Sequence, residues 1–171
     1  MDLAEFIADV PDFPIDGVLF KDITPLLSEP KAFKEAVDLM AAEFEHKEID
    51  QVVAIESRGF IFGAPVAYQL GCGFVLVRKP EKLPREAVSV QYSLEYGTNT
   101  LEMHADSIQS GDRVLLVDDL LATGGSARAA IDLIEELGGK VVGIAFLIEL
   151  AFLRGREKLA DYDIYSIITF D

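Results

Sequence analysis

The chain has 171 residues, half of them hydrophobic, which is enough for one α/β domain with a sizeable core but not for a second full domain. Its formal net charge of −15 argues against nucleic acid or an anionic membrane as a partner, because both are bound through Lys and Arg clusters. Its single cysteine, Cys72, excludes an intramolecular disulfide, and the amino terminus lacks the features of a signal peptide, so we expect a cytoplasmic protein.

Along the chain, short apolar runs typical of strands buried on both faces alternate with longer segments that have helical spacing. The expected helices are 2–9, 31–47, 59–70 and 126–137. The expected strands are 51–55, 74–77, 113–118, 141–148 and 163–169. This alternation predicts an α/β fold, with a mostly parallel twisted sheet flanked by helices.

One long polar segment, 78–98, interrupts this pattern and mixes basic residues with prolines and a glycine. A connection of this length in a compact domain is usually a functional lid or a flexible excursion. We therefore treat 78–98 as a candidate lid loop.

The segment 114–126 carries the strongest functional signal. Four apolar residues, 114–117, are followed by Asp118 and Asp119, and a small Thr-Gly-Gly-Ser turn, 123–126, then leads into the predicted helix. Ligands of open α/β sheets bind at this edge, where the amino end of a helix favours an anion and glycines permit close backbone approach. The pattern predicts a site for a sugar phosphate.

The two acids need a separate explanation, because negative charge beside a phosphate is repulsive. Asp118 and Asp119 can accept hydrogen bonds from vicinal ribose hydroxyls, or hold Mg²⁺ directly or through water. The alternative is a solvated loop whose acids only cap the next helix. The other common phosphate motifs, a P-loop and a GxGxxG turn after a strand, do not occur in the sequence.

The run 114–127 resembles the phosphoribosyl pyrophosphate (PRPP) signature of the type I phosphoribosyltransferases, and further segments narrow the resemblance to the adenine phosphoribosyltransferases. Those segments keep the family's order nearly end to end: 17–25, 56–63, 77–80 with 82–84, 92–97 and 149–158. The resemblance implies one domain, 1–171, with a small N-terminal hood that binds the base, 1–30, and a flexible lid, 78–98. It also implies a homodimer that converts adenine and PRPP to AMP and diphosphate with Mg²⁺, which PRPP mainly holds.

The family's site residues map onto this chain by position. Glu95 matches the proposed general acid/base, and Arg58 is the expected catalytic cation for the pyrophosphate. The PRPP site implied by the resemblance contains Ser57, Arg58, Arg78, Lys79, Lys82, Asp118, Asp119, Ala122, Thr123, Gly124, Gly125 and Ser126. The implied adenine pocket contains Leu19, Phe20, Lys21 and Leu150. The family also has a non-proline cis peptide bond at the position of the Glu56-Ser57 junction.

Simpler interpretations of these residues remain open. Arg58 could form a surface ion pair, the lid cations a solvated loop, and Glu95 the edge of a strand. Phe20 and Leu150 could be ordinary core residues. The chain also departs from the family at two positions, since Glu81 stands where glycine is usual and Lys21 where arginine is usual.

Two other functions compete with adenine phosphoribosyl transfer. A phosphoribosyltransferase for xanthine, hypoxanthine or guanine would need a donor such as lysine to the purine O6, and no residue of the sequence matches one. A PRPP-sensing regulator would need an added DNA-binding domain, for which this acidic chain has neither a basic helix nor spare length.

Overall fold

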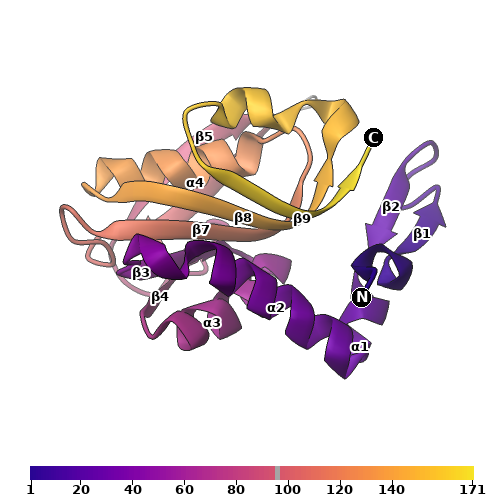
Figure 1. The fold of residues 1–171 in the computed structure, drawn as a ribbon. Coiled ribbons are helices and arrows are strands. Elements are labelled where there is room, and N and C mark those ends of the chain that lie inside the picture. Colours follow the sequence, from indigo (N-terminus) through magenta and orange to yellow (C-terminus); the bar gives the residue numbers. More distant parts are fainter. Residues whose placement is uncertain (95–96) are drawn as a thin grey trace.

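The computed structural model describes residues 1–94 and 97–171, and five parallel strands form its central sheet in the order β4-β3-β7-β8-β9 (Figure 1). The strands are β3 (Gln51–Ile55), β4 (Gly73–Val77), β7 (Arg113–Leu121), β8 (Lys140–Leu150) and β9 (Ile164–Phe170). Apolar runs predicted all five, and the parallel α/β architecture is confirmed. Only β3 matches its expected range, and the other four strands differ from theirs by one to three residues at one or both ends.

Helices cover both faces of the sheet, as expected. Helices α2 (Pro30–Phe44) and α3 (Arg58–Leu70) pack on one face, while α4 (Gly125–Glu136) covers the other (Figure 1). Each contact is a separate apolar cluster, with Phe44 and Phe62 fully buried in the first and Ile131 and Phe146 in the second. In the described part of the chain, no helix is long and apolar enough to cross a membrane.

The order in which strands are added to the sheet reverses at β3, while all five strands stay parallel. After β3 the chain passes through α3 to β4 on one side, and it later returns on the other side of β3 to form β7. The helices that follow β3 and β7 lie on opposite faces. This arrangement is a topological switch point, where open α/β sheets hold their ligands.

The predicted helix 2–9 is wrong beyond its first turn. A short 3-10 helix, η1 (Leu3–Phe6), is followed by strand β1 (Ala8–Pro11), which pairs antiparallel with β2 (Leu19–Asp22). The local spacing favoured a helix, but pairing with a segment ten residues away fixes the backbone as a strand. The hood therefore consists of η1, the β1-β2 hairpin and the short helix α1 (Thr24–Ser28).

The segment 78–98 contains a regular strand in addition to loop residues. Strand β5 (Ala87–Ser93) lies within it and pairs antiparallel with β6 (Thr98–His104) along seven residues. In β5, half-buried side chains alternate with exposed ones from Val88 to Ser93, whereas β6 is half-buried or buried from Thr100 on, and the hairpin packs against α4. Among the described residues of this segment, the loop expectation holds for 79–86, 94 and 97, and the movement of the segment as a lid stays a prediction.

The remaining elements are short 3-10 helices: η2 (Glu45–Lys47), η3 (Ala151–Leu153) and η4 (Gly155–Leu159).

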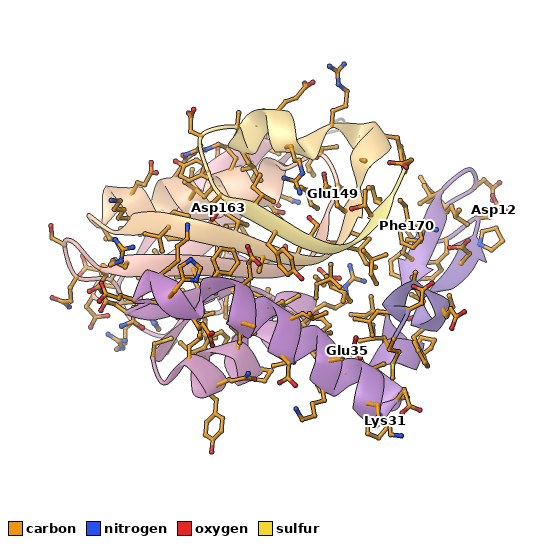
Figure 2. All side chains as sticks on the ribbon, in the orientation of Figure 1. Asp12, Lys31, Glu35, Glu149, Asp163 and Phe170 are labelled. Atoms are coloured by element: carbon orange, nitrogen blue, oxygen red, sulfur yellow. The ribbon has the colours of Figure 1, made fainter. Side chains whose placement is uncertain are left out.

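Lys21 attaches the hood to the carboxyl end of β9. Its ammonium group lies 3.9 Å from the ring centroid of Phe170 and forms an ion pair with Asp9, its cross-strand neighbour. The Lys21 side chain is only 10% exposed, whereas the Asp9 side chain is 56% exposed, so the ion pair remains open to water on the aspartate side. Figures 1 and 2 show the β1-β2 hairpin beside the end of β9, with Phe170 on the side that faces it.

We predict that Lys21→Met lowers the free energy of local opening of the hood by about 1 kcal/mol, because the cation-π contact is lost while the apolar stem remains. Hydrogen exchange of the amides in residues 8–22 measures this opening. Lys34→Met removes an exposed ion pair with Asp38 on α2 and serves as the control. Equal exchange rates in the two variants would contradict the proposed anchor.

Candidate functional site

The loops that follow β3 and β7 open into one cavity of about 720 Å³ at the carboxyl edge of the sheet. This is the predicted location, and most of the residues expected to bind PRPP lie here. The cavity is lined by Ser57, Arg58, Lys79, Asp118, Asp119 and the whole of 122–126. The structure does not place Arg78 or Lys82 among the described residues that line it.

Asp118 is buried against the amino end of α3. Its Oδ1 accepts a hydrogen bond from the backbone N–H of Asp119 at 2.9 Å. A Cβ added at Gly59 would lie only 2.8 Å from the same oxygen, so the glycine is what allows the carboxylate to approach the helix. Burial, followed by the charge of Asp119, raises the pKa of Asp118 well above its ordinary value.

Asp119 faces Arg58. The Arg58 Nε lies 2.7 Å from Asp119 Oδ2, and the arginine is about half exposed while the aspartate is nearly buried. This pair crosses the switch point, because Arg58 begins α3 and Asp119 belongs to β7. The simple alternative for Arg58, an ion pair at the protein surface, is therefore not what the structure shows: its partner is a buried acid of the cavity.

The turn 122–124 and the start of α4 form the expected anion cradle. Gly124 has a φ of +87°, and a Cβ there would lie 2.7 Å from the backbone oxygen of Gly155, so both backbone conformation and space require glycine. No side chain caps the amino end of α4. Its first N–H groups and the hydroxyls of Thr123 and Ser126 therefore remain as donors along the cavity wall.

The loop after β3 contains the expected cis peptide bond between Glu56 and Ser57. The Glu56 carboxylate accepts a hydrogen bond from the backbone N–H of Lys79, and its other oxygen lies 3.5 Å from the Arg78 guanidinium. Arg78 is thus a partner of Glu56 in this structure, whereas Lys79 reaches the cavity. Nearby, the backbone N–H of Glu81 donates to Glu102, which further attaches the root of the candidate lid to β6.

The structure does not bring the four expected adenine residues into the main cavity. Phe20 lines a second, mainly apolar cavity of about 490 Å³ between the hood and α3, and Lys21 is held by Asp9 and Phe170. Leu19 is half exposed, and Leu150 packs against the core cluster that contains α2 and α3. Arg58 lines both cavities, with its guanidinium carbon 5.3 Å from the Phe20 ring centroid, and so connects them.

Glu95, the expected general acid/base, lies outside the described residues. Its neighbours Tyr92, Ser93 and Leu94 line the main cavity, and the Tyr92 ring lies 3.3 Å from the position that a Cβ of Gly125 would occupy. Lys158, from η4, also lines this cavity. Tyr92 and Lys158 received no role from the sequence, although both fall within segments on which the family resemblance rests.

The described residues contain no group of three or more His, Cys, Asp or Glu side chains arranged to hold a metal ion. Asp118 and Asp119 are two hard oxygen donors at one edge of the cavity, which suits a divalent cation whose other ligands come from the substrate and water. A substrate-held cation therefore fits this site better than a cation bound by the protein alone.

Comparisons with known proteins agree with this geometry. The sequence profile of the phosphoribosyl transferase domain matches residues 22–171. The adenine phosphoribosyltransferase of Roseiflexus sp. is 55% identical over 168 residues, which cover 98% of each chain. The crystal structure of adenine phosphoribosyltransferase from Thermoanaerobacter pseudethanolicus matches with a TM-score of 0.96 and 53% identity, over 99% of this chain and 98% of that one.

A third similar protein carries ligands. The adenine phosphoribosyltransferase of Saccharomyces cerevisiae, in complex with adenine and an imino-altritol bisphosphate, has a TM-score of 0.92 and 39% identity, over 97% of this chain and 96% of that one.

We predict that Asp118→Asn raises the free energy of unfolding at neutral pH by about 1 kcal/mol, because it removes a buried charge and keeps the oxygen that accepts the Asp119 N–H. The folded state binds the Asp118 proton more tightly than the unfolded state, so the ionised carboxylate destabilises the fold and this effect fades as the pH falls. The advantage of the Asn variant should shrink with it. Urea unfolding at a series of pH values measures the difference.

The control is Asp119→Asn, which weakens the ion pair with Arg58 and should give no stabilisation. If Asp118→Asn were less stable than the unmodified protein at neutral pH, the buried carboxylate would not carry the expected cost.

Proposed function

Because the chain belongs to the phosphoribosyl transferase family, we propose that it transfers the 5-phosphoribosyl group of PRPP to adenine, forming AMP and diphosphate. One observation carries the proposal: the acid pair Asp118-Asp119 and the cradle 122–126 share a cavity with Arg58. The full-length similarity to adenine phosphoribosyltransferases supports adenine as the base. The reaction is a step of purine salvage.

The reaction breaks the bond between the ribose anomeric carbon and the pyrophosphate oxygen, which leaves with the electron pair. Adenine N9 then holds a new bond to that carbon, and the N9 proton must be removed. The transition state has oxocarbenium character, so the site must hold the ribose, neutralise the leaving group and accept the proton.

We assign these tasks to different walls of the cavity. The cradle 122–126 holds the 5-phosphate through backbone N–H groups, and the acid pair Asp118-Asp119 accepts hydrogen bonds from the ribose hydroxyls. Ser57 and Arg58 follow β3, Lys79 lies at the root of the candidate lid, and these three residues bind the pyrophosphate. We retain Arg78 and Lys82 as pyrophosphate ligands only if the segment 78–98 moves when substrate binds.

Mg²⁺ is the cation we propose. Bound mainly through PRPP, it would supply positive charge against the leaving pyrophosphate, and Asp118 and Asp119 are the residues that would contact it or its waters. The protein's own contribution is to keep both acids at the ribose edge. The Arg58 contact with Asp119 limits the negative charge there before substrate binds.

For the base, we propose a pocket between the hood and the main cavity. Phe20 contributes an aromatic face beside Arg58, and backbone groups of Leu19 and Lys21 read the edge of the purine. The Lys21 side chain is already engaged by Asp9 and Phe170, which favours reading by the backbone. On this view, lysine in place of the usual arginine leaves adenine recognition intact. Leu150 closes the pocket from the end of β8.

We also propose that the chain is a cytoplasmic homodimer, as in the family. An exposed apolar groove between α2 and α3, where Tyr68 is 90% exposed, is a suitable contact surface for a second copy.

The direct test supplies PRPP, Mg²⁺ and each free purine in turn, and measures nucleotide and diphosphate formation. We expect AMP from adenine and little product from the 6-oxo purines, because the cavity presents no identified donor to O6. Activity confined to 6-oxo purines would assign the chain to a different base. PRPP binding without turnover on any base would favour the regulator.

We predict that Glu95→Gln lowers kcat by about two orders of magnitude while the KM for PRPP changes little, because the amide cannot exchange the purine proton. Steady-state kinetics with adenine and PRPP separate the two parameters. Glu86→Gln removes an exposed carboxylate from the same segment and is the matched control. Unchanged turnover in Glu95→Gln would exclude the assigned role.

A further inference from the structure

The main cavity has no excess of positive charge among its described lining residues, although the proposed substrate is a polyphosphate. Among its described lining residues, Glu56, Asp118 and Asp119 oppose only the cations Arg58, Lys79 and Lys158. Arg58 is already paired with Asp119. With a net charge of −15 over the whole chain, each remaining cation has a large effect on the affinity for an anion. Lys158 is the cation for which neither the family resemblance nor the mechanism above provides a role.

Lys158 reaches the cavity from η4, which lies directly against the phosphate cradle. A Cβ at Gly155 would lie 2.4 Å from the backbone oxygen of Ala122, so the two backbones are in contact. Gly124 meets Gly155 from the other side in the same way. The side chain of Leu159 is fully buried beneath this turn. The position of Lys158 relative to 122–126 is therefore fixed by close packing.

An ion pair between the half-exposed Arg156 and the buried carboxylate of Glu149 holds the same turn to the sheet. Arg156 donates two hydrogen bonds to Glu149, at 2.7 and 2.8 Å, and the Glu149 side chain is only 8% exposed. These hydrogen bonds lower the pKa of Glu149, so the pair stays charged at neutral pH. Figure 2 shows Glu149 on β8, at the side of the sheet that the turn covers.

The charged residues of this turn differ in what they contact. Arg156 is occupied by Glu149, and Arg154, which is 75% exposed, pairs with Glu157. Lys158 forms no ion pair with any carboxylate in the part of the chain that the structure describes, and it alone of the three lines the cavity. The turn thus brings Lys158 to the cavity wall without an ion-pair partner among the described residues. The other two cations, Arg154 and Arg156, are paired with glutamates.

We propose that Lys158 binds the phosphate monoester of the sugar, at the cradle 122–126. The assignment rests on the proposed function for the identity of the sugar phosphate. Lys158 supplies the full positive charge that the neutral N–H groups and hydroxyls of the cradle lack. Lys158 comes from η4, which packs on the cradle. Arg58 and Lys79 come from the loops after β3 and β4, so we expect the effect of Lys158 to be specific to the phosphate end of the substrate.

The test compares Lys158→Met with Arg154→Met, which removes one positive charge from the same turn but outside the cavity. Isothermal titration calorimetry measures the binding of ribose 5-phosphate and of pyrophosphate, each to the full chain. We expect Lys158→Met to raise the Kd for ribose 5-phosphate about tenfold and to leave the Kd for pyrophosphate nearly unchanged. Arg154→Met should change neither, and Lys158→Arg should restore most of the ribose 5-phosphate affinity.

Three results would overturn the proposal: unchanged ribose 5-phosphate binding in Lys158→Met, an equal loss of pyrophosphate binding, or an equal loss in Arg154→Met. The last two would reveal a general charge effect. Turnover of adenine by the unmodified protein is measured in parallel. A protein that lacks this turnover but shows the Lys158-dependent binding would contradict the proposed reaction and leave the phosphate assignment standing.

Discussion

The contact between Arg58 and Asp119 joins the parts on which the site depends. Arg58 opens α3 after β3, and Asp119 ends the apolar run of β7, so their ion pair spans the switch point of the sheet. The same guanidinium lies beside Phe20 of the hood. A change in the position of this one side chain therefore alters both the main cavity and the smaller cavity beside the hood. Under the proposed function, substrate that binds in either cavity would meet the same ion pair.

The acids of the site show why such a contact is needed. Asp118 is held in a buried position at a cost in stability, which is visible in its raised pKa, and only Gly59 leaves room for it. Asp119 avoids a similar cost through Arg58. An enzyme that binds an anionic sugar through two carboxylates must place them where hydroxyls are recognised and must shield them elsewhere. The buried placement of Asp118 and the pairing of Asp119 meet these two demands separately.

The sequence predicted the five sheet strands, the three long helices and the loops at the sheet edge, because each depends on local apolar runs and glycine turns. It failed for residues 8–11, where pairing with 19–22 overrides helical spacing, and for 87–93, where pairing with β6 makes a strand of a polar segment. The contact between Arg78 and Glu56 was not predicted for a related reason, since it joins residues that are 22 positions apart. Local pattern does not contain such partners.

The cradle 122–126 also depends on a contact that its local sequence does not predict. The motif 122–126 predicts an anion site from its own glycines and hydroxyls, yet its shape in the structure depends on Gly155, some thirty residues later in the chain. Contact between two glycine backbones leaves no side-chain pattern that a motif would include. The turn that supplies Gly155 is fixed by Glu149 and Arg156, and it also delivers Lys158 to the cavity. The resemblance over 149–158 therefore has a physical basis in the phosphate site as well as in the base pocket that Leu150 suggested.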